Sequence, residues 1–157
     1  MQEYISKSRE QTQKIAADFA KELKGGEVLC FYGNLGSGKT TFIQALAKTL
    51  GVKENVTSPT FVLMKKYPRR GGACPRPSKR ATARVAPTRS FFYHMDAYRL
   101  SNSQEALDLG LEEIWNDKNN IIAIEWADKI NDILPKKKID LCFESLSENE
   151  RKITIFQ

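Results

Sequence analysis

"FYGNLGSGKTTF", residues 31–42, decides the fold of the chain, because it joins an apolar strand to a helix through a glycine-rich turn. Gly33 is followed by four residues and then by Gly38, Lys39 and Thr40, which is the spacing of a P-loop. Glycines let the backbone approach a phosphate closely, and successive N–H groups at a helix start bind anions. This spacing assigns Lys39 to the β- and γ-phosphates and the Thr40 hydroxyl to Mg²⁺. The predicted nucleotide-binding residues are Gly33, Asn34, Leu35, Gly36, Ser37, Gly38, Lys39, Thr40 and Thr41.

Both flanks of the loop support this prediction. Residues 27–32, "EVLCFY", are an apolar run of strand length. Residues 40–50, "TTFIQALAKTL", are predicted as a helix with Gly51 as its C-cap candidate. Its apolar stripe consists of Phe42, Ile43, Leu46 and Leu50. A glycine turn that only joined a strand to a helix would need neither the lysine nor the threonine.

Length and composition predict a single globular domain. The chain has 157 residues, of which 41% are hydrophobic and 28% charged, enough for one central sheet with its helices. No stretch approaches about 18 consecutive apolar residues and the polar start does not resemble a signal peptide, so we expect a cytoplasmic protein without membrane contact. Cys30, Cys74 and Cys142 lack a CxxC spacing, which suggests neither a zinc site nor a disulfide framework.

The order of the predicted elements indicates an α/β fold. Strands and helices alternate over the first two-thirds of the chain and two strands close it, as in a P-loop NTPase-like, partly parallel central sheet flanked by helices and closed by antiparallel strands. Besides the two elements around the loop, we expect helices over 8–24 and 103–115 and a hairpin of 138–145 and 151–157. Strands are expected over 58–67 and 121–126, and in 91–100 up to about Asp96.

Two acidic residues are the candidates for catalysis. Asp96 closes the run "FFYHMD" and Glu125 closes "IIAIE", so each lies at the carboxyl end of a strand, where open α/β sheets bind ligands. Carboxylates there can hold the waters of a bound ion and position a nucleophile. The alternative is a structural carboxylate that caps a helix or pairs with Arg99 or Lys129. We assign the metal to Thr40 and Glu125; which acid orients the water stays open.

Three further residues near these acids are weaker candidates. His94 shares a strand face with Asp96, and we expect it to be a packed histidine hydrogen-bonded near the phosphates. Trp126 follows Glu125 and should point to the opposite face, into the core or toward a partner. Thr60 could sense the γ-phosphate as in a switch loop, or could cap a turn.

Four ordered motifs, "GNLGSGKTTF", "SPTF", "YHMDAYRL" and "IEWADKI…LP", resemble the bacterial TsaE (YjeE) family. The resemblance covers most of residues 8–135. It implies ATP binding with Mg²⁺, slow hydrolysis, and docking on the proteins TsaB and TsaD, which install a threonylcarbamoyl group on an adenosine of tRNA. The motif residues of that family fall on Lys39, Thr40, Thr60, Asp96, Glu125 and Trp126.

The chain departs from the family pattern at two places. Asn34 stands where the family usually has aspartate, which should leave nucleotide binding intact. Residues 68–90 replace a short connection and contain seven basic residues and no acidic one. The rest of the chain has 18 Lys and Arg against 19 Asp and Glu, a net charge of −1, although the whole chain has a net charge of +6. Because this segment has four prolines and one large apolar residue, we expect a disordered basic insertion, with a weak tRNA contact as the alternative.

Other functions fit the sequence less well. A small-molecule kinase could use the basic segment as a lid, but its proline and glycine content disfavours a compact lid. A GTPase would need an Asn-Lys-x-Asp motif, which the chain lacks. A scaffold that binds ATP without hydrolysing it remains an alternative.

Overall fold

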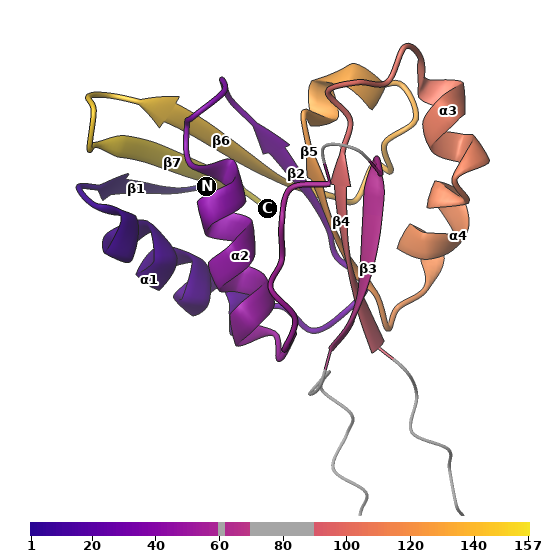
Figure 1. Ribbon diagram of the computed structural model, residues 1–157, viewed down its shortest axis with the longest axis horizontal. Helices are drawn as coiled ribbons and strands as arrows, with labels where there is room; N and C mark the ends of the chain where they lie inside the picture. The colour runs from indigo at the N-terminus through magenta and orange to yellow at the C-terminus, as the bar shows by residue number, and fades with distance from the viewer. Residues whose placement is uncertain (60–61, 70–89) are drawn as a thin grey trace, which may run out of the picture.

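The computed structural model describes residues 1–59, 62–69 and 90–157. Its centre is a seven-stranded sheet (Figure 1). Its strand order is β1-β7-β6-β2-β5-β4-β3. The four central strands β6, β2, β5 and β4 are parallel, and the outer pairings are antiparallel. The strands are β1 (Gln2–Ser6), β2 (Val28–Tyr32), β3 (Met64–Arg69), β4 (Ser90–Asp96), β5 (Ile121–Glu125), β6 (Ile139–Ser145) and β7 (Arg151–Phe156). The predicted α/β fold class is confirmed.

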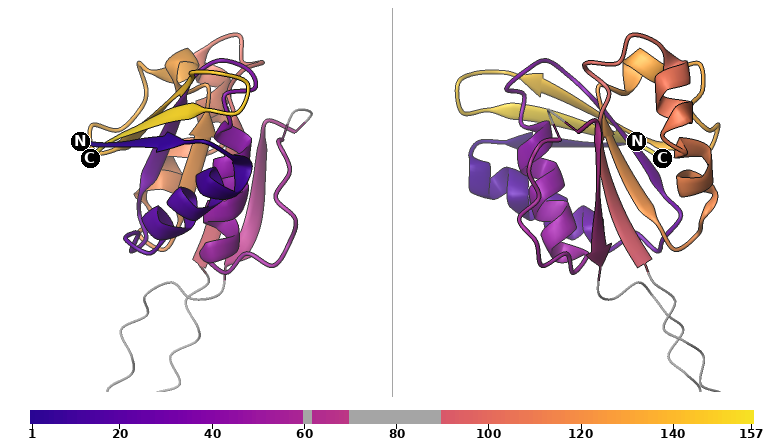
Figure 2. Two further views of the ribbon diagram at one scale, coloured as in Figure 1. Left: turned by 90° about the vertical axis from the view of Figure 1, so that its left-hand side faces the viewer. Right: turned by 45° about the vertical axis from the view of Figure 1, so that its right-hand side comes forward.

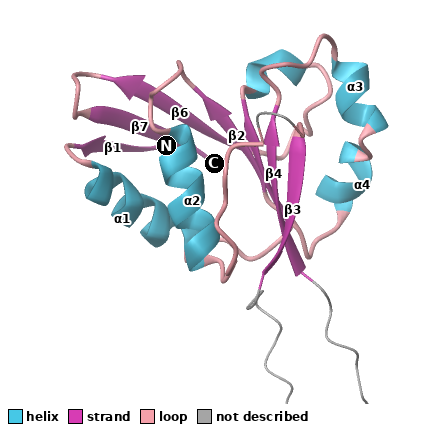
Figure 3. Ribbon diagram, viewed as in Figure 1, coloured by secondary structure: helices cyan, strands magenta, loops and turns pink. Residues whose placement is uncertain are grey.

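Helices cover both faces of the sheet (Figures 2 and 3). One buried cluster joins α1 and α2 to the sheet, and a second joins the opposite face to α3, α4 and η1. Within the described ranges, no helix has the length and apolarity needed to cross a membrane. The helices are α1 (Arg9–Ala20), α2 (Lys39–Thr49), α3 (Ser103–Asp108), α4 (Leu111–Asn116) and the 3₁₀ turn η1 (Ala127–Ile130).

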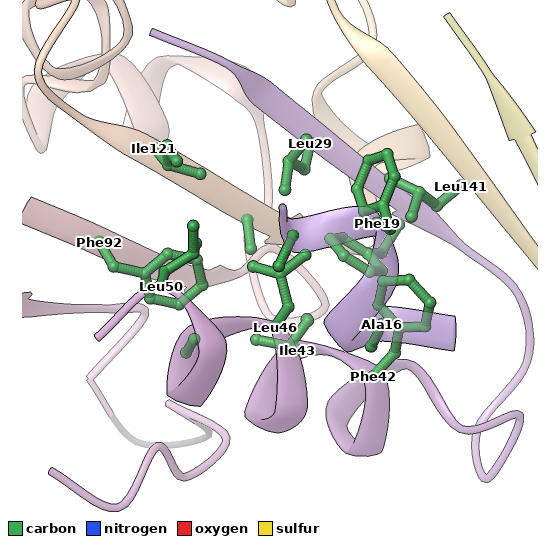
Figure 4. Close-up of a cluster of buried hydrophobic side chains, with 14 of the residues drawn as sticks. Ala16, Phe19, Leu29, Phe42, Ile43, Leu46, Leu50, Phe92, Ile121 and Leu141 are labelled. Carbon is green, nitrogen blue, oxygen red and sulfur yellow. The ribbon is translucent and has the colours of Figure 1, made fainter. Parts of the chain in front are cut away.

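The apolar stripe of α2 fixes this helix against the sheet (Figure 4). Phe42, Ile43 and Leu46 are completely buried, as the sequence predicts. The Phe42 ring packs edge-on against Phe31 of β2 and Phe143 of β6, with ring centroids 6.0 and 5.4 Å apart. Such aromatic pairs stabilise packing beyond simple burial. The loop between β2 and α2 is therefore held by two rigidly packed elements.

The amino-terminal segment differs from the prediction. Residues 2–6 form β1, which pairs antiparallel with β7. Helix α1 begins after Ser8, whose side chain accepts a hydrogen bond from the Gln11 backbone N–H at 3.2 Å, and it ends at Ala20 rather than near residue 24. The strand was missed because five half-polar residues show no alternation that sets them apart from a loop, and only pairing with β7 makes them a strand.

Two of the three cysteines, Cys30 and Cys142, lie in the part of the chain that the structure describes. Cys30 is completely buried on β2, and burial raises the pKa of its thiol to about 12. Cys142 is half-buried and also free. Cys74 lies outside the described residues. Cys30 therefore packs as a small apolar side chain without the thiolate that reactivity requires.

The ends of the expected insertion belong to the sheet, which corrects its boundaries. Pro68 pairs with Phe91 and Arg69 with Ser90 at the end of the β3–β4 ladder. Arg69 is buried, and its guanidinium donates a hydrogen bond to the backbone oxygen of Asn119 at 3.2 Å. Cross-strand pairing and this contact order residues that composition alone assigned to the insertion. Residues 70–89 lie outside the described residues, so their disorder stays a prediction.

Deleting residues 70–89 and joining β3 to β4 by a two-residue Asn-Gly turn should preserve the fold. Because Arg69 and Ser90 are already paired, the shortened connection needs only the length of an ordinary hairpin loop. We expect the free energy of unfolding to rise by roughly 1–2 kcal/mol, since a shorter loop costs less closure entropy. The deletion removes six basic residues and leaves 19 basic against 19 acidic ones.

Thermal unfolding and ATP titration test this prediction, because they measure the melting temperature and the ATP affinity of the deletion variant. Extending the deletion to 68–90 is the matched comparison, because it also removes the buried Arg69 and should lower the melting temperature. If the 70–89 deletion unfolds the protein, the segment is structural. A sharp, salt-sensitive loss of tRNA affinity would instead support a tRNA-contacting arm.

Candidate functional site

The glycine-rich loop connects β2 to α2 through three residues with positive φ. Gly33, Gly36 and Gly38 have φ of 134°, 76° and 101°, which other residues rarely adopt. A Cβ on Gly33 would also clash with the backbone oxygen of Phe143. Gly38 is the N-cap of α2. Each motif glycine is therefore required by backbone conformation, and Gly33 by space as well.

Lys39 is buried at the first residue of α2, with 4% of its surface exposed. Its ammonium donates hydrogen bonds to the backbone oxygens of Gly33 at 2.6 Å and Asn34 at 2.9 Å. It also lies 4.4 Å from the centre of the Trp126 ring, a cation–π contact. Burial lowers the pKa of Lys39, and the nearby carboxylates, Glu125 first, oppose that shift. The loop thus encloses a cation that makes two hydrogen bonds to the loop backbone.

Glu125, at the end of β5, is bonded to the P-loop threonine. The Thr40 hydroxyl donates to the two carboxylate oxygens, at 3.0 Å to Oε1 and 3.2 Å to Oε2. His94 Nε2 lies 2.8 Å from Oε1 of the same carboxylate. Glu125 is 4% exposed. The sequence prediction that His94 is packed and hydrogen-bonded is confirmed; its nearness to bound phosphates stays a prediction.

Asp96 ends β4 directly beside Glu125. The two acids are partners in register on neighbouring parallel strands. Asp96 is half-buried; it accepts a hydrogen bond from the Tyr98 backbone N–H at 3.0 Å and lies 3.4 Å from the Ser58 hydroxyl. Both predicted acids therefore lie at the carboxyl edge of the central strands, next to the loop.

A cavity of about 410 Å³ lies between the loop and the two acids. Gly33 and Asn34 do not line it; their carbonyl oxygens hold Lys39 instead. The other predicted nucleotide-binding residues and the two acids all line this space. The lining consists of Leu35, Gly36, Ser37, Gly38, Lys39, Thr40, Thr41, Ser58, Asp96, Tyr98, Arg99, Glu125 and Trp126. The structure thus brings together residues from three strand ends and one helix start.

The structure corrects the prediction for Trp126. Its backbone adopts φ 56° and ψ 44°, which is not a strand conformation. The alternation of side chains along β5 therefore ends at Glu125, and the expected placement of Trp126 on the opposite face does not hold. The indole therefore lines the cavity, contacts Lys39, and stacks at an angle on Tyr98 with ring centroids 4.9 Å apart. Part of the ring also packs against the second buried cluster.

Three lining residues were not predicted as site residues: Ser58, Tyr98 and Arg99. Tyr98 and Arg99 follow Asp96 so closely that the strand-end argument could have included them, and Arg99 adds a cation to the cavity. Ser58 opens the "SPTF" motif, but within that motif only Thr60 was considered as a site residue. Thr60, the candidate γ-phosphate sensor, lies outside the described residues.

The residues at this edge fit a magnesium ion. Mg²⁺ is typically held by one or two protein oxygens with several waters, and here the Thr40 hydroxyl and the Glu125 carboxylate already touch. A denser group of three or more His, Cys, Asp or Glu side chains suited to a metal is not found among the described residues.

The sheet order, the strand–loop–helix unit and the paired acids define an α/β protein of the P-loop NTPase-like class. The model of the family described as "Threonylcarbamoyl adenosine biosynthesis protein TsaE" matches residues 6–153. The chain belongs to the TsaE family.

Relatives from two bacteria bear the name "tRNA threonylcarbamoyladenosine biosynthesis protein TsaE". The Bacillus subtilis protein is 35% identical over 145 residues, covering 92% of this chain and 78% of the relative. The Aquifex aeolicus protein is 36% identical over 161 residues, covering 100% and 97%. A crystal structure of YdiB from Bacillus subtilis superposes with a TM-score of 0.69 at 28% identity, covering 98% of this chain and 83% of that one. These similarities place the chain in threonylcarbamoyladenosine biosynthesis.

Proposed function

We propose that this chain is a weak Mg²⁺-dependent ATPase that acts with TsaB and TsaD in threonylcarbamoyladenosine modification of tRNA. The observation that carries the ATPase proposal is the bond from the Thr40 hydroxyl to Glu125, beside the buried Lys39 ammonium. A cation, a hydroxyl and two strand-end acids around one cavity are the groups that phosphoryl transfer to water requires.

Lys39 and the loop bind the triphosphate. The backbone N–H groups from Gly36 to Thr40 surround the phosphates, and the N-terminal end of α2 adds a favourable dipole. Lys39 exchanges its bonds to the Gly33 and Asn34 oxygens for bonds to the β- and γ-phosphates. Its partial desolvation strengthens these bonds, because little water competes for the ammonium.

Thr40 and Glu125 would hold the Mg²⁺ ion, and Asp96 would orient the attacking water. Bound Mg²⁺ would neutralise charge on the phosphate oxygens. Thr40 and Glu125 suit the metal because their oxygens are in direct contact. Asp96 is next to Glu125 in register but accepts hydrogen bonds from residues other than Thr40, which leaves it available to a water in the same cavity.

The proposed partners follow from family membership. The members are named for a tRNA modification, whereas the site of this chain is suited to ATP hydrolysis. TsaB and TsaD, the pair implied by the family, would stimulate hydrolysis by docking. A slow basal rate is expected because Tyr98, which lines the cavity, is exposed to solvent in the isolated chain.

Single-turnover hydrolysis with and without TsaB and TsaD tests this function. We expect ATP to bind to the isolated chain, slow hydrolysis, and faster hydrolysis in the complex. A pull-down of both partners, with and without ATP, measures docking separately. ATP binding without hydrolysis in any combination would indicate a scaffold, and transfer of phosphate to a small molecule would indicate a kinase.

A further inference from the structure

His94 is a buried polar side chain among apolar neighbours. It is completely buried on the face of β4 that carries Phe92, and its partner in register on β5 is Ala123. Phe92 and Ala123 belong to the cluster beneath α2. Burying a polar ring among such residues is unfavourable unless it makes hydrogen bonds. Packing alone does not account for a histidine here.

The hydrogen bond of His94 is directed at one group, the carboxylate of Glu125. Nε2 lies 2.8 Å from Oε1, whereas Nδ1 has no hydrogen-bond partner among the described residues. A carboxylate oxygen accepts, so Nε2 carries the hydrogen and donates it. The imidazole is therefore tied to the site through a single atom.

Glu125 needs such a support. Within the described residues its carboxylate receives hydrogen bonds from His94 and Thr40. The Thr40 hydroxyl is itself proposed to bind the metal, so it cannot serve as a fixed support. His94 comes from a different strand and is immobilised by burial. Side chains in this arrangement fix the orientation of a metal-binding carboxylate and leave its other lone pairs available.

We propose that His94 is a positioning residue, which holds Glu125 through Nε2–H in the orientation needed for metal binding and hydrolysis. The inference rests on the proposed ATPase function. His94 acts on turnover more than on nucleotide affinity, because it contacts neither the loop nor Lys39 in the hydrogen bonds of the described residues.

Two substitutions of similar polarity separate positioning from packing. In His94→Gln the amide nitrogen is as many bonds from Cβ as Nε2 and can replace its hydrogen bond to Glu125. In His94→Asn the amide nitrogen is one bond closer to Cβ and cannot reach. Met95→Leu is the control, since Met95 is the next residue of β4, equally buried, and faces the other cluster.

We expect His94→Asn to lower kcat in the TsaB–TsaD complex roughly 10- to 100-fold with little change in KM for ATP. His94→Gln should recover most of that loss, and Met95→Leu should behave as wild type. A second readout needs no turnover: Mn²⁺ titration of the ADP-bound chain by electron paramagnetic resonance. We expect weaker Mn²⁺ binding in His94→Asn than in His94→Gln.

Equal values for the Asn and Gln variants in both readouts would overturn the proposal and leave His94 a packing residue. Should the variants fail to fold, nitrogen NMR of the wild-type protein still decides, because the chain has one histidine. Hydrogen on Nε2 in the ADP-bound protein supports the proposal, and hydrogen on Nδ1 alone contradicts it. If the wild-type chain binds ATP but never hydrolyses it, the proposed function fails while the Mn²⁺ titration still tests His94.

Discussion

Replacing Lys39 by alanine should abolish ATP binding within the range of an ordinary titration. Lys39 is the cation enclosed by the loop, with 4% of its surface exposed, and a phosphate chain would replace the Gly33 and Asn34 oxygens as its partners. Removing one partner from a buried, hydrogen-bonded pair of charges costs about 2–5 kcal/mol, which corresponds to a loss of affinity from about 30-fold to several thousand-fold.

The measurement is a titration with a fluorescent ATP analogue. Lys48→Ala is the matched control, because Lys48 lies on the same helix, is exposed, and belongs to its last turn. We expect the control to bind as wild type and both variants to unfold at similar temperatures. Affinity near wild type in Lys39→Ala would show that the loop is not the phosphate site.

Removing the charge of either strand-end acid should stop hydrolysis while nucleotide binding persists at least in part. Positioned acids and bases contribute typically 10²- to 10⁴-fold, so we expect kcat in the complex to fall about 100-fold or more in Asp96→Asn and Glu125→Gln. The amides keep the size of the side chains and can still accept hydrogen bonds. Alanine at Glu125 would be less informative, because it takes away the acceptor of the buried His94 Nε2–H and of the half-buried Thr40 hydroxyl.

The dependence on Mg²⁺ distinguishes the two acids. If Glu125 shares the metal with Thr40, the Glu125→Gln variant should need more Mg²⁺ for half-maximal hydrolysis. Asp96→Asn should keep the wild-type requirement and lose rate only. Asp128→Asn is the control, because Asp128 is exposed and does not line the cavity. Full partner-stimulated activity in either acid variant would make that residue structural.

The loop and its flanks could be predicted because their signals are local. Positive φ at Gly33, Gly36 and Gly38 depends on residue type, and the stripe of α2 depends on helical periodicity. The same holds for Asp96 and Glu125, since a residue that closes a parallel strand lies at the edge where ligands bind. No information from distant parts of the chain is needed for any of these.

Other features depend on contacts between distant segments. Residues 2–6 become a strand only by pairing with β7, and Arg69 is ordered only by pairing with Ser90 and bonding to Asn119. Their own composition favours a loop, so reasoning from local pattern missed them. Cross-strand pairing outweighs such weak local preferences.

Sequence alone determined that the chain has a P-loop, a partly parallel sheet and two acids at its carboxyl edge. Tertiary structure alone decided how those groups meet. Trp126 reaches Lys39 because the backbone turns to φ 56° after β5, which ends the strand alternation. His94 and Glu125 are 31 positions apart in the chain. They meet because the strand register pairs His94 with Ala123, and Glu125 lies two residues further along β5. Such contacts follow from strand pairing and backbone turns, which spacing along the chain does not encode.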